Sequence, residues 1–504
     1  MHISLKSALL ALSVSLLAGS TVSAQEADRT VTIAFPYQFD NLDACNSSSE
    51  PGLVVGQNVA ESLTYLSPVD GSISPRLATA WEQVEPTVWR LTIREGVSFH
   101  DGAPLNAEAV ATSINRMFKP DLDCLNRFKL FSGITLTPTV VDEYTLDIST
   151  EQPQVLMPVF LSFVSIDSPN TDQTRLVSTP IGTGPYLVEP RDGMDDIVLT
   201  RFDGYWGEQP DVERAIYKYR DESAVRAAMV QVGEADLALA IALQDANNPE
   251  TDFGHAVGET TRARFTFKPP LDDIRVRRAF NLAVDRELLR DALFGPDFQI
   301  ATQMFGPNIN GYNPDLEPWP YDPEEARRLI EEARADGVPV DTEVPLISMI
   351  DFYPNGREAM EAMIAMWAEV GLNVRLESIE RAQWLKIVNK PFAEDRSAMI
   401  LQESHGNTNG DATFTMRFRY HTDGQQSEFS DPHLDELIES AEQASGEERV
   451  ELFQEANRYT YAEIVPDVLM FHMVEMARVS PRLDFRPTEV TTSLLELSKI
   501  HFAD

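Results

Sequence analysis

The sequence has 504 residues, of which 43% are apolar, and it carries a formal net charge of −39 at pH 7. This apolar content is typical of a folded globular protein, and the length predicts two or three domains because one hydrophobic core rarely serves so long a chain. The acidity argues against nucleic acid and anionic membrane surfaces as partners. A solubility adaptation explains the acidity more simply than a preference for cationic ligands.

The first 24 residues are interpreted as an export signal. Lys6 supplies a positive charge, Ala8–Leu17 form a short apolar core, and Val22-Ser23-Ala24 provide the small residues of a cleavage site. The apolar segment is too short to span a bilayer as a helix, and no cysteine lies near the cleavage site to carry a lipid. We therefore expect a soluble exported protein that begins near Gln25.

The first half of the mature chain is predicted to mix strands and helices. The alternation of Thr30–Phe35 indicates a strand, and the apolar spacing within Ala107–Phe118 indicates a helix. Further strands are expected at 89–93, 144–149, 197–201, 215–219 and 235–241, and further helices at 52–65 and 223–232.

The sequence contains two cysteines, Cys45 and Cys124. In an oxidising compartment such a pair favours a disulfide, although two unrelated buried thiols would give the same composition. The sequence does not give the separation that a disulfide requires, so both alternatives stay open. No Cys-x-x-Cys motif or His/Cys cluster indicates a zinc site, and no metal or cofactor is expected.

The strongest helix signal of the chain lies between Pro269-Pro270 and Gly295-Pro296. The first proline pair prevents a helix upstream, and Asp272 and Asp273 offer acceptors to the N–H groups of a first turn. One apolar stripe follows, formed by Val276, Phe280, Ala283 and Val284. We expect a single long helix that starts directly after a strand-like run at 264–268.

The second half alternates helices and strands, which predicts an α/β lobe. Asp322 and Pro323 are a typical helix start, and Gly337 is a typical stop. Further helices are expected at 357–370, 434–444 and 447–464, and extended segments at 343–350, 372–379, 398–401 and 467–479. Two crossovers, at 264–270 and 474–480, are expected to join two lobes as a hinge.

Motifs of common enzymes are missing from the sequence. It has no G-x-S-x-G elbow, no H-E-x-x-H motif and no P-loop. Gly182-Thr183-Gly184 lacks the third glycine of a dinucleotide fingerprint, so we interpret it as a backbone turn. We predict that the protein is not an enzyme.

Several short segments resemble a known family in the order in which that family carries them. In addition to PPLDDIRVRRAFNLAVDRELLRDAL at Pro269–Leu293, these segments are Leu77–Glu82 (LATAWE), Leu91–Gly102 (LTIREGVSFHDG), Gly182–Tyr186 (GTGPY), Tyr205–Glu208 (YWGE) and Tyr321–Ala326 (YDPEEA). The match runs over nearly the whole mature chain. It is similar to the family 5 extracellular solute-binding proteins, which are the dipeptide-, oligopeptide- and nickel-binding components of bacterial ABC importers.

The resemblance implies an α/β, two-lobed periplasmic-binding-protein clamshell of the class II type, with an extra subdomain inserted in the first lobe. Lobe I would comprise residues 25–266 with 479–504, including the subdomain at about 45–178, and lobe II would comprise 267–478. The open form of a monomer would capture a small peptide or peptide-like solute between the lobes and deliver it to a permease in the inner membrane. An opine, an oligosaccharide or chelated nickel is an alternative solute, and an exported hydrolase or a chaperone-like or sensory protein is an alternative class.

The most polar stretch, Gln402–Phe414, is predicted to form a loop at the end of an apolar strand, where α/β lobes present ligand groups. By resemblance, Asp411 stands where peptide-binding members carry an aspartate that pairs with the α-ammonium of the ligand. The family's usual tryptophan and Asp-Pro neighbours are missing here, and Asp411 could instead cap the next helix. Ser404, His405 and Asn407 could contact the ligand or only hold the loop together.

Other candidates for the ligand site lie at the edges of the lobes. For each of them, packing in a core is an equally good interpretation. These candidates are Phe35 and Tyr37 after the first strand, Phe265 and Phe267 on the first crossover, and His472 and Met473 on the return crossover. Arg375, Lys386 and Arg417 lie in the right lobe to meet a ligand carboxylate, and the sequence gives no reason to choose among them.

Overall fold

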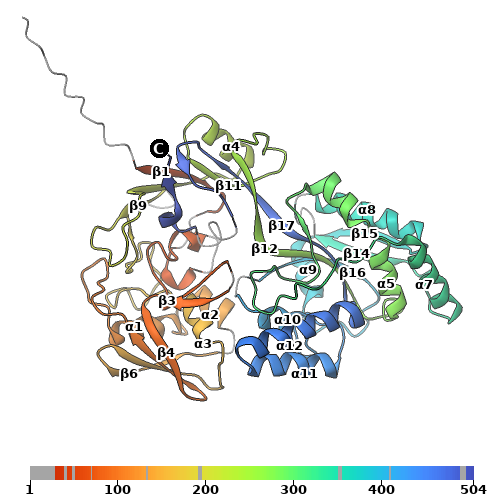
Figure 1. Cartoon of the computed structure of the whole chain (residues 1–504), viewed down its shortest axis with the longest axis horizontal. Helices are drawn as coiled ribbons and strands as arrows, with labels where there is room; N and C mark the ends of the chain where they lie inside the picture. The colour runs from red at the N-terminus through yellow and green to blue at the C-terminus, as the bar shows by residue number, and fades with distance from the viewer. Residues whose placement is uncertain are drawn as a thin grey trace, which may run out of the picture.

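The computed structural model shows two lobes joined by two long strands, β12 (Asp252–Phe265) and β17 (Asp467–Val479) (Figure 1). The described residues are 29–38, 42–47, 51–69, 71–131, 134–190, 196–349, 353, 355–407, 410–488 and 495–503, so the predicted export signal lies outside them. Within these ranges no helix is long and apolar enough to cross a membrane. β17 has the bounds predicted for the extended segment 467–479 and contains nearly all of the second predicted crossover, 474–480. β12 ends at Phe265, so only the first two residues of the other predicted crossover, 264–270, are strand.

One sheet runs through both lobes and contains 11 strands in the described part of the chain. Its order is β15-β14-β16-β12-β17-β11-β1-β10-β9-β8, with β13 paired to β17. The other strands of this sheet are β1 (Thr30–Phe35), β8 (Tyr186–Val188), β9 (Ile197–Arg201), β10 (Arg214–Tyr219), β11 (Leu237–Ile241), β13 (Gln299–Ile300), β14 (Val344–Met349), β15 (Val374–Ile379) and β16 (Ile400–Gly406).

The two crossover strands change their neighbours half-way along. Residues Asp252–Ala256 of β12 pair with the C-terminal part of β17, and the register then shifts between Ala256 and Thr260 and again before Arg262. From Glu259 onward β12 also pairs with β16 of the second lobe. The chain therefore passes from one lobe to the other upstream of the predicted crossover at 264–270. The last residues of β12, which precede the proline pair, are already paired with a strand of the second lobe. The lobe limits stay a prediction.

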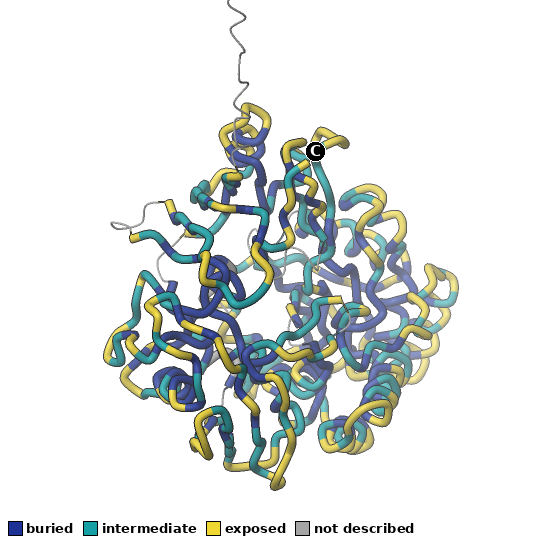
Figure 2. Tube along the Cα trace, turned by 60° about the vertical axis from the view of Figure 1, so that its left-hand side comes forward, coloured by how far each residue is buried: buried dark blue, intermediate teal, exposed yellow. Residues whose placement is uncertain are grey.

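The first lobe has its core on both faces of its part of the sheet. Val31, Ile33 and Phe35 of β1 pack in the larger cluster, and α4 (Ser223–Gln231) packs over the other face through a smaller cluster. Figure 2 shows buried positions running through the inside of both lobes and exposed positions on the outer turns. The C-terminal part of this lobe contains β18 (Leu483–Asp484), the 3-10 turn η6 (Leu497–Lys499) and β19 (His501–Phe502).

A subdomain with its own core extends from the first lobe. Its four-stranded sheet has the order β4-β5-β7-β6, and α1 (Ala107–Met117) packs against it. Its other elements are η1 (Ala44–Asn46), η2 (Pro51–Val54), β2 (Thr64–Leu66), β3 (Ile73–Pro75), β4 (Ala78–Glu85), β5 (Val88–Ile93), α2 (Leu125–Leu130), β6 (Thr137–Asp142), β7 (Thr145–Ser149), α3 (Met157–Phe160) and η3 (Leu161–Phe163).

The predicted helix at 52–65 is wrong. The segment forms the short turn η2, then irregular backbone, and then β2. Gln57 adopts a left-handed conformation with φ of 60°, which no α-helix can include, and its amide donates a hydrogen bond to Ser62. The apolar spacing that predicted a helix packs this irregular segment against the cores of the lobe and the subdomain instead.

Helices cover the sheet of the second lobe and form a separate cluster below it (Figure 1). The predicted start of α7 is confirmed, because Asp322 accepts a hydrogen bond from the Glu325 N–H at 3.0 Å. The helices are α5 (Ile274–Leu282), α6 (Arg286–Leu289), α7 (Pro323–Ala335), α8 (Gly356–Glu369), α9 (Arg381–Val388), α10 (Thr413–Arg419), α11 (Pro432–Gln443) and α12 (Gly446–Tyr459), with π-helical turns η4 (Arg290–Phe294) and η5 (Thr460–Ile464).

The single long helix predicted after Pro270 is wrong in its length. The chain breaks after Leu282, and Asp285 starts α6 by accepting a hydrogen bond from the Leu288 N–H at 2.9 Å. The predicted apolar stripe is buried throughout. Arg277 is buried as well, and it donates to the carbonyls of Ile464 and Leu271. Carbonyl groups left free by irregular turns hold this guanidinium inside.

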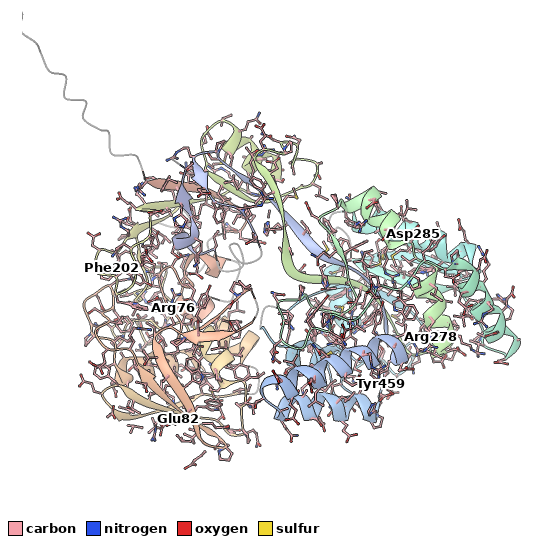
Figure 3. All side chains as sticks on the ribbon, in the orientation of Figure 1. Arg76, Glu82, Phe202, Arg278, Asp285 and Tyr459 are labelled. Carbon is pink, nitrogen blue, oxygen red and sulfur yellow. A yellow bond between two sulfur atoms is a disulfide. The ribbon has the colours of Figure 1, made fainter. Side chains whose placement is uncertain are left out.

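Separate family motifs meet at one buried carboxylate, that of Glu61. Arg76 and Tyr205 donate to its Oε1 at 2.9 and 3.0 Å, and Trp206 and Thr183 donate to its Oε2 at 2.8 and 2.9 Å. Figure 3 labels Arg76 within the first lobe. All four hydrogen-bonding positions of the carboxylate are occupied, so these motifs serve folding.

The glycines of Gly182-Thr183-Gly184 allow a close backbone approach beside Glu61. A Cβ atom at Gly184 would lie 2.6 Å from the carbonyl oxygen of Asn58. The interpretation of this segment as backbone geometry is confirmed.

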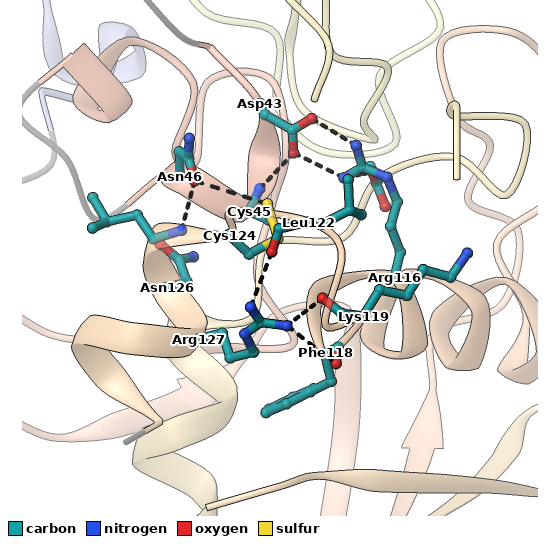
Figure 4. The surroundings of a disulfide bond; sticks show 12 residues. Asp43, Cys45, Asn46, Arg116, Phe118, Lys119, Leu122, Cys124, Asn126 and Arg127 are labelled. Carbon is teal, nitrogen blue, oxygen red and sulfur yellow. Dashed lines mark hydrogen bonds and ion pairs between the residues drawn. A yellow bond between two sulfur atoms is a disulfide. The ribbon is translucent and has the colours of Figure 1, made fainter. Parts of the chain in front are cut away.

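Cys45 and Cys124 form a disulfide with their Cα atoms 5.3 Å apart (Figure 4). Directly beside it, Arg116 donates to both oxygens of Asp43 at 2.8 and 2.7 Å, and Asp43 also accepts from the Cys45 N–H. Of the two alternatives left open by the sequence, the disulfide is confirmed. It ties η1 to the start of α2, which are 79 residues apart in sequence.

We expect the double variant Cys45→Ser, Cys124→Ser to lose about 2–4 kcal/mol of unfolding free energy, because the disulfide restricts the unfolded chain. Urea denaturation of both proteins measures the difference, and disulfide reduction of the wild type should reproduce it. A loss below about 0.5 kcal/mol, which is typical of a surface substitution, would contradict this expectation.

Candidate solute site between the lobes

A pocket of about 400 Å³ lies between the two lobes. Its volume is within the range of small-molecule sites. From the first lobe it is lined by Ile134, Leu156, Val159, Phe160 and Phe163, and from the second lobe by Asp411, Thr413, Phe414, Arg417, Phe418, Asp423, Gly424 and Gln425. Both lobes therefore contribute walls to one site.

The first-lobe wall is entirely apolar. Ile134 comes from the connection between α2 and β6, and the other four residues come from α3, η3 and the residue before α3; all five side chains are half-buried. Thr64 of β2 fixes α3 by donating to the carbonyl of Pro158 at 2.7 Å. Half-buried apolar side chains that face a pocket gain free energy when a ligand removes them from water.

Two aromatic rings of α10 dominate the opposite wall. Phe414 and Phe418 are one helical turn apart, and their rings stack with centroids 5.7 Å apart. Phe414 is 40% exposed and also stacks on the ring of His405 at 5.5 Å. The exposed ring of Phe414 and the half-buried ring of Phe418 together give this wall an apolar aromatic face for a ligand.

Asp411 lines the pocket, but the guanidinium of Arg449 already pairs with its carboxylate. Arg449 donates through Nη2 to Oδ1 at 2.7 Å and through Nε to Oδ2 at 2.9 Å, and Asn310 donates to Oδ2 at 3.0 Å. The Thr413 N–H donates to Oδ1 at 2.9 Å. Burial alone would raise the pKa of Asp411, but the hydrogen bonds and the charge of Arg449 hold it below its usual value.

The geometry of Asp411 thus supports its alternative role at the start of α10. The carboxylate accepts from the first N–H of the helix, and its charge is compensated inside the lobe. Pairing with a ligand ammonium stays a prediction, and Arg449 would compete with that ammonium.

His405 and Asn407 hold the polar segment to α10. The guanidinium of Arg419 can only donate, so Nδ1 of His405 accepts its hydrogen bond at 3.0 Å, and Nε2 donates to Thr415 Oγ1 at 2.7 Å. Burial and the charge of Arg419 keep the pKa of His405 well below its usual value, so the ring is neutral. Asn407 donates to the same hydroxyl at 2.7 Å.

The polar segment Gln402–Phe414 is not all loop, as we expected. Residues up to Gly406 continue β16, because they pair with Glu259–Ala263 of β12. Ser404 is half-buried in that strand. Only the residues that follow Gly406 can form the predicted loop, and Thr408 and Asn409 lie outside the described residues.

The structure places the remaining candidates away from the pocket lining. Phe35 and Phe265 are fully buried in the cores of the two lobes, so neither side chain offers a surface to a ligand here. Tyr37 packs edge-on against Phe35 at 5.6 Å. The half-buried Phe267 packs under the guanidinium of Arg277 at 4.2 Å.

The return crossover contributes His472 and Met473, which are 7% and 8% exposed. His472 Nδ1 shares a hydrogen bond with Thr260 Oγ1 at 2.8 Å. Among the ten residues predicted to bind ligand, Asp411 alone lines the pocket. Ligand contact by the other nine stays a prediction.

The three basic residues that could meet a ligand carboxylate differ in their position relative to the pocket. Arg417 lines the pocket and pairs with Glu442, whereas Arg375 lies on β15 and pairs with Glu343 and Glu377. Lys386 is exposed on α9 and does not line the pocket.

Behind the aromatic wall, a buried ionic network fixes α10 to the sheet. Glu403 of β16 pairs with Arg262 and Arg264 of β12 and with Arg419 of α10, at 2.6, 3.2 and 3.1 Å. Arg262 also pairs with Asp467 of β17 at 2.9 Å. Four elements are therefore joined by charges that lie out of contact with water, which gives the pocket wall a rigid support.

The lobes touch beside the pocket. Gly410 has φ of +69°, and a Cβ atom there would lie 2.6 Å from Cδ1 of Leu66 in β2. A Cβ atom at Gly71, in the connection from β2 to β3, would lie 2.8 Å from the carbonyl oxygen of Gly410. Glycine at these two positions allows the hairpin of the first lobe to rest on the loop that precedes Asp411.

Residues 72–426 match the family model described as bacterial extracellular solute-binding proteins, family 5 Middle. The chain belongs to this family. The resemblance in the sequence is confirmed, and family 5 proteins are non-enzymatic solute-binding components of ABC importers. The family implies a permease as partner and an extracellular or periplasmic location.

Three family relatives differ in what their names say they bind. Glutathione-binding protein GsiB of Salmonella typhi is 27% identical over 370 residues, which cover 71% of this chain and 71% of the relative. The dipeptide-binding protein of Escherichia coli (strain K12) is 26% identical over 424 residues, which cover 76% and 78%. The nickel-binding periplasmic protein of the same strain is 28% identical over 298 residues, which cover 55% and 57%.

A solved structure confirms the family 5 fold. HbpA2 from Haemophilus parasuis superposes with a TM-score of 0.81 at 22% identity, covering 94% of this chain and 100% of the other.

We expect Asp411→Asn to destabilise the protein by about 3–5 kcal/mol at pH 7, because Arg449 would stay buried without a counter-charge. Since the pKa of Asp411 is depressed in the folded state, the wild type loses this contribution as the pH falls below the unfolded value of about 4. The difference in stability between the two proteins should therefore shrink as the pH falls below about 4, by at most about 1.4 kcal/mol per pH unit for a single proton. Urea denaturation from pH 3 to 7 tests this, with the exposed Asp315→Asn as control, which should change stability by less than about 0.5 kcal/mol.

Proposed function

We propose that this protein captures a small peptide or peptide-like solute in the periplasm and delivers it to the permease of its ABC importer. The observation that carries the proposal is the pocket whose two walls come from different lobes. Its aromatic and aliphatic lining suits the apolar side chains of a short peptide. The names of the glutathione-binding and dipeptide-binding relatives support the same class of solute.

Capture would work by closure of the lobes around the solute. A solute between the α3 side and the α10 side gains contacts with both walls only when the lobes approach, so it stabilises the closed form by differential contacts. The register shifts of β12 between Ala256 and Arg262 lie where the chain passes between lobes. Irregular pairing at that point is where a small change of backbone angles can rotate one lobe against the other.

A nickel chelate is the second candidate, because one relative is named a nickel-binding protein. In the described ranges, no group of three or more His, Cys, Asp or Glu side chains is placed to hold a metal ion. Opines and oligosaccharides are further alternatives. Cleavage of the export signal near Ala24, and a monomeric state, belong to the proposal as well.

A binding screen tests the proposed solute class. The mature protein from Gln25 is heated with dipeptides, tripeptides, glutathione, opines, oligosaccharides and nickel chelates, each in large excess. A ligand at about 100 times its dissociation constant stabilises the folded state by about 2.7 kcal/mol, so binding peptides should raise the melting temperature. A rise with sugars, opines or nickel chelates alone would overturn the peptide assignment and leave the membership of the family intact.

We expect Phe414→Ala to weaken binding of whichever peptide the screen identifies by about 1–3 kcal/mol, or roughly 5- to 150-fold, because the ring forms the flat face of the pocket. Isothermal titration calorimetry measures the loss. Tyr321→Ala is the matched control, since Tyr321 is 47% exposed in the same lobe and does not line the pocket. Equal affinity of the two variants would show that the solute binds elsewhere.

A further inference from the structure

We propose that Asp423 binds the cationic group of the solute, and that the solute combines an apolar or aromatic body with one positive charge. The inference rests on the proposed function, because it assigns a role to one side chain of the pocket between the lobes. A peptide with a free N-terminus and an aromatic first residue has this chemistry, and so does a simple aromatic amine.

Three charged side chains line the pocket, and two of them are already paired inside the protein. Asp411 is neutralised by Arg449, and Arg417 donates to both oxygens of Glu442 at 2.7 and 3.0 Å. The carboxylate of Asp423 has no hydrogen bond or ion pair among the residues that the structure describes, and it is exposed at the pocket wall. The pocket therefore presents one uncompensated negative charge.

The nearby cation does not remove that charge. Lys390 is influenced by the charge of Asp423, but its ammonium donates to the carbonyl of Thr422 at 2.7 Å and forms no ion pair with Asp423. His421 faces Asp423 only through Nδ1, which accepts the Asp423 backbone N–H at 3.1 Å. A cationic group of a solute would thus be the first direct partner of this carboxylate.

The loop that carries Asp423 is held in place before any solute binds. The Thr422 N–H donates to Asp435 at 2.8 Å, and the Gly424 N–H donates to the carbonyl of His421 at 2.7 Å. A Cβ atom at Gly424 would lie 2.8 Å from the carbonyl oxygen of Phe418, so the loop lies tightly against the end of α10. Because the backbone of the loop is already ordered, only the side chain of Asp423 has to be ordered when a solute binds, which favours affinity.

The apolar walls define the rest of the solute. Phe160 and Phe163 of the first lobe and Phe414 and Phe418 of the second lobe line the same pocket as Asp423. An aromatic or aliphatic body would lie between these rings, with its charge at the exposed carboxylate. Because Asp423 stays partly in contact with water, the cost of removing water from its charge is small and the attraction is screened by salt.

Two matched probe pairs test the proposal by calorimetry at 20 mM salt. One pair is the dipeptide Phe-Ala and N-acetyl-Phe-Ala, and the other is phenethylamine and 3-phenylpropionate. We expect the member of each pair that carries an ammonium group to bind about tenfold more tightly. The variant Asp423→Asn should reduce that preference below about twofold, whereas the exposed control Asp315→Asn should keep it. Raising the salt to 500 mM should weaken binding of the probes that carry an ammonium group more for wild type than for Asp423→Asn.

The outcomes separate this inference from the proposed function. Binding of both dipeptides with equal affinity, or a preference that survives in Asp423→Asn, would overturn the role of Asp423 while the peptide function stands. Binding of phenethylamine but of neither dipeptide, with dependence on Asp423, would support the role and overturn the peptide function. Failure of all four probes would overturn the role of Asp423, whereas the peptide function would still be decided by the wider screen. Because Asp423 is exposed, its variant should unfold at the wild-type temperature, which a melting curve verifies.

Discussion

The buried carboxylate of Glu403 is the constraint on which the geometry of the site depends. It lies among three guanidinium groups, so β12, β16 and α10 can pack only if this one negative charge is present and ionised. Burial and the neighbouring charge of Arg262 lower the pKa of Arg419 to about 9, which still leaves it cationic at neutral pH. Removing one member of such a network costs more than its pairing contributes, because the others stay buried and uncompensated.

Buried carboxylates that accept several hydrogen bonds also occur in the first lobe, where one of them joins residues of separate family motifs. Glu61 accepts hydrogen bonds from segments that are far apart in sequence. Asp43 accepts hydrogen bonds from Arg116 and from backbone N–H groups beside the disulfide. In each case an acidic side chain inside a strongly acidic protein is fully bonded. The excess negative charge therefore lies mainly on the surface, where it needs no partner.

Sequence patterns predicted those parts of the fold that local residues determine. The strands β1 and β17 and the start of α7 follow from alternation and capping within a few residues. The break before Asp285 and the left-handed Gln57 depend on single conformations that periodicity does not reveal.

The site was less predictable, because its geometry arises from distant segments. Asp411 was identified as a polar residue beside a strand, but its partner Arg449 lies 38 residues away on another helix. The first-lobe wall around Phe160 has the apolar spacing of an ordinary core, so nothing in the sequence marked it as a binding surface. In the second-lobe wall, the spacing of Phe414 and Phe418, one helical turn apart, is a local signal that could have indicated an apolar helix face.

The position of β17 in the sheet also limits the order in which the parts of the protein can fold. This strand lies between β12 and β11 in the sheet, although about half of the chain separates it from β11 in sequence. An emerging chain can form the subdomain and much of the second lobe early, but the first lobe keeps an open sheet edge until residues 467–479 arrive. Such long-range pairing slows folding. The core of the first lobe therefore closes only after the C-terminal segment has reached its place between β12 and β11.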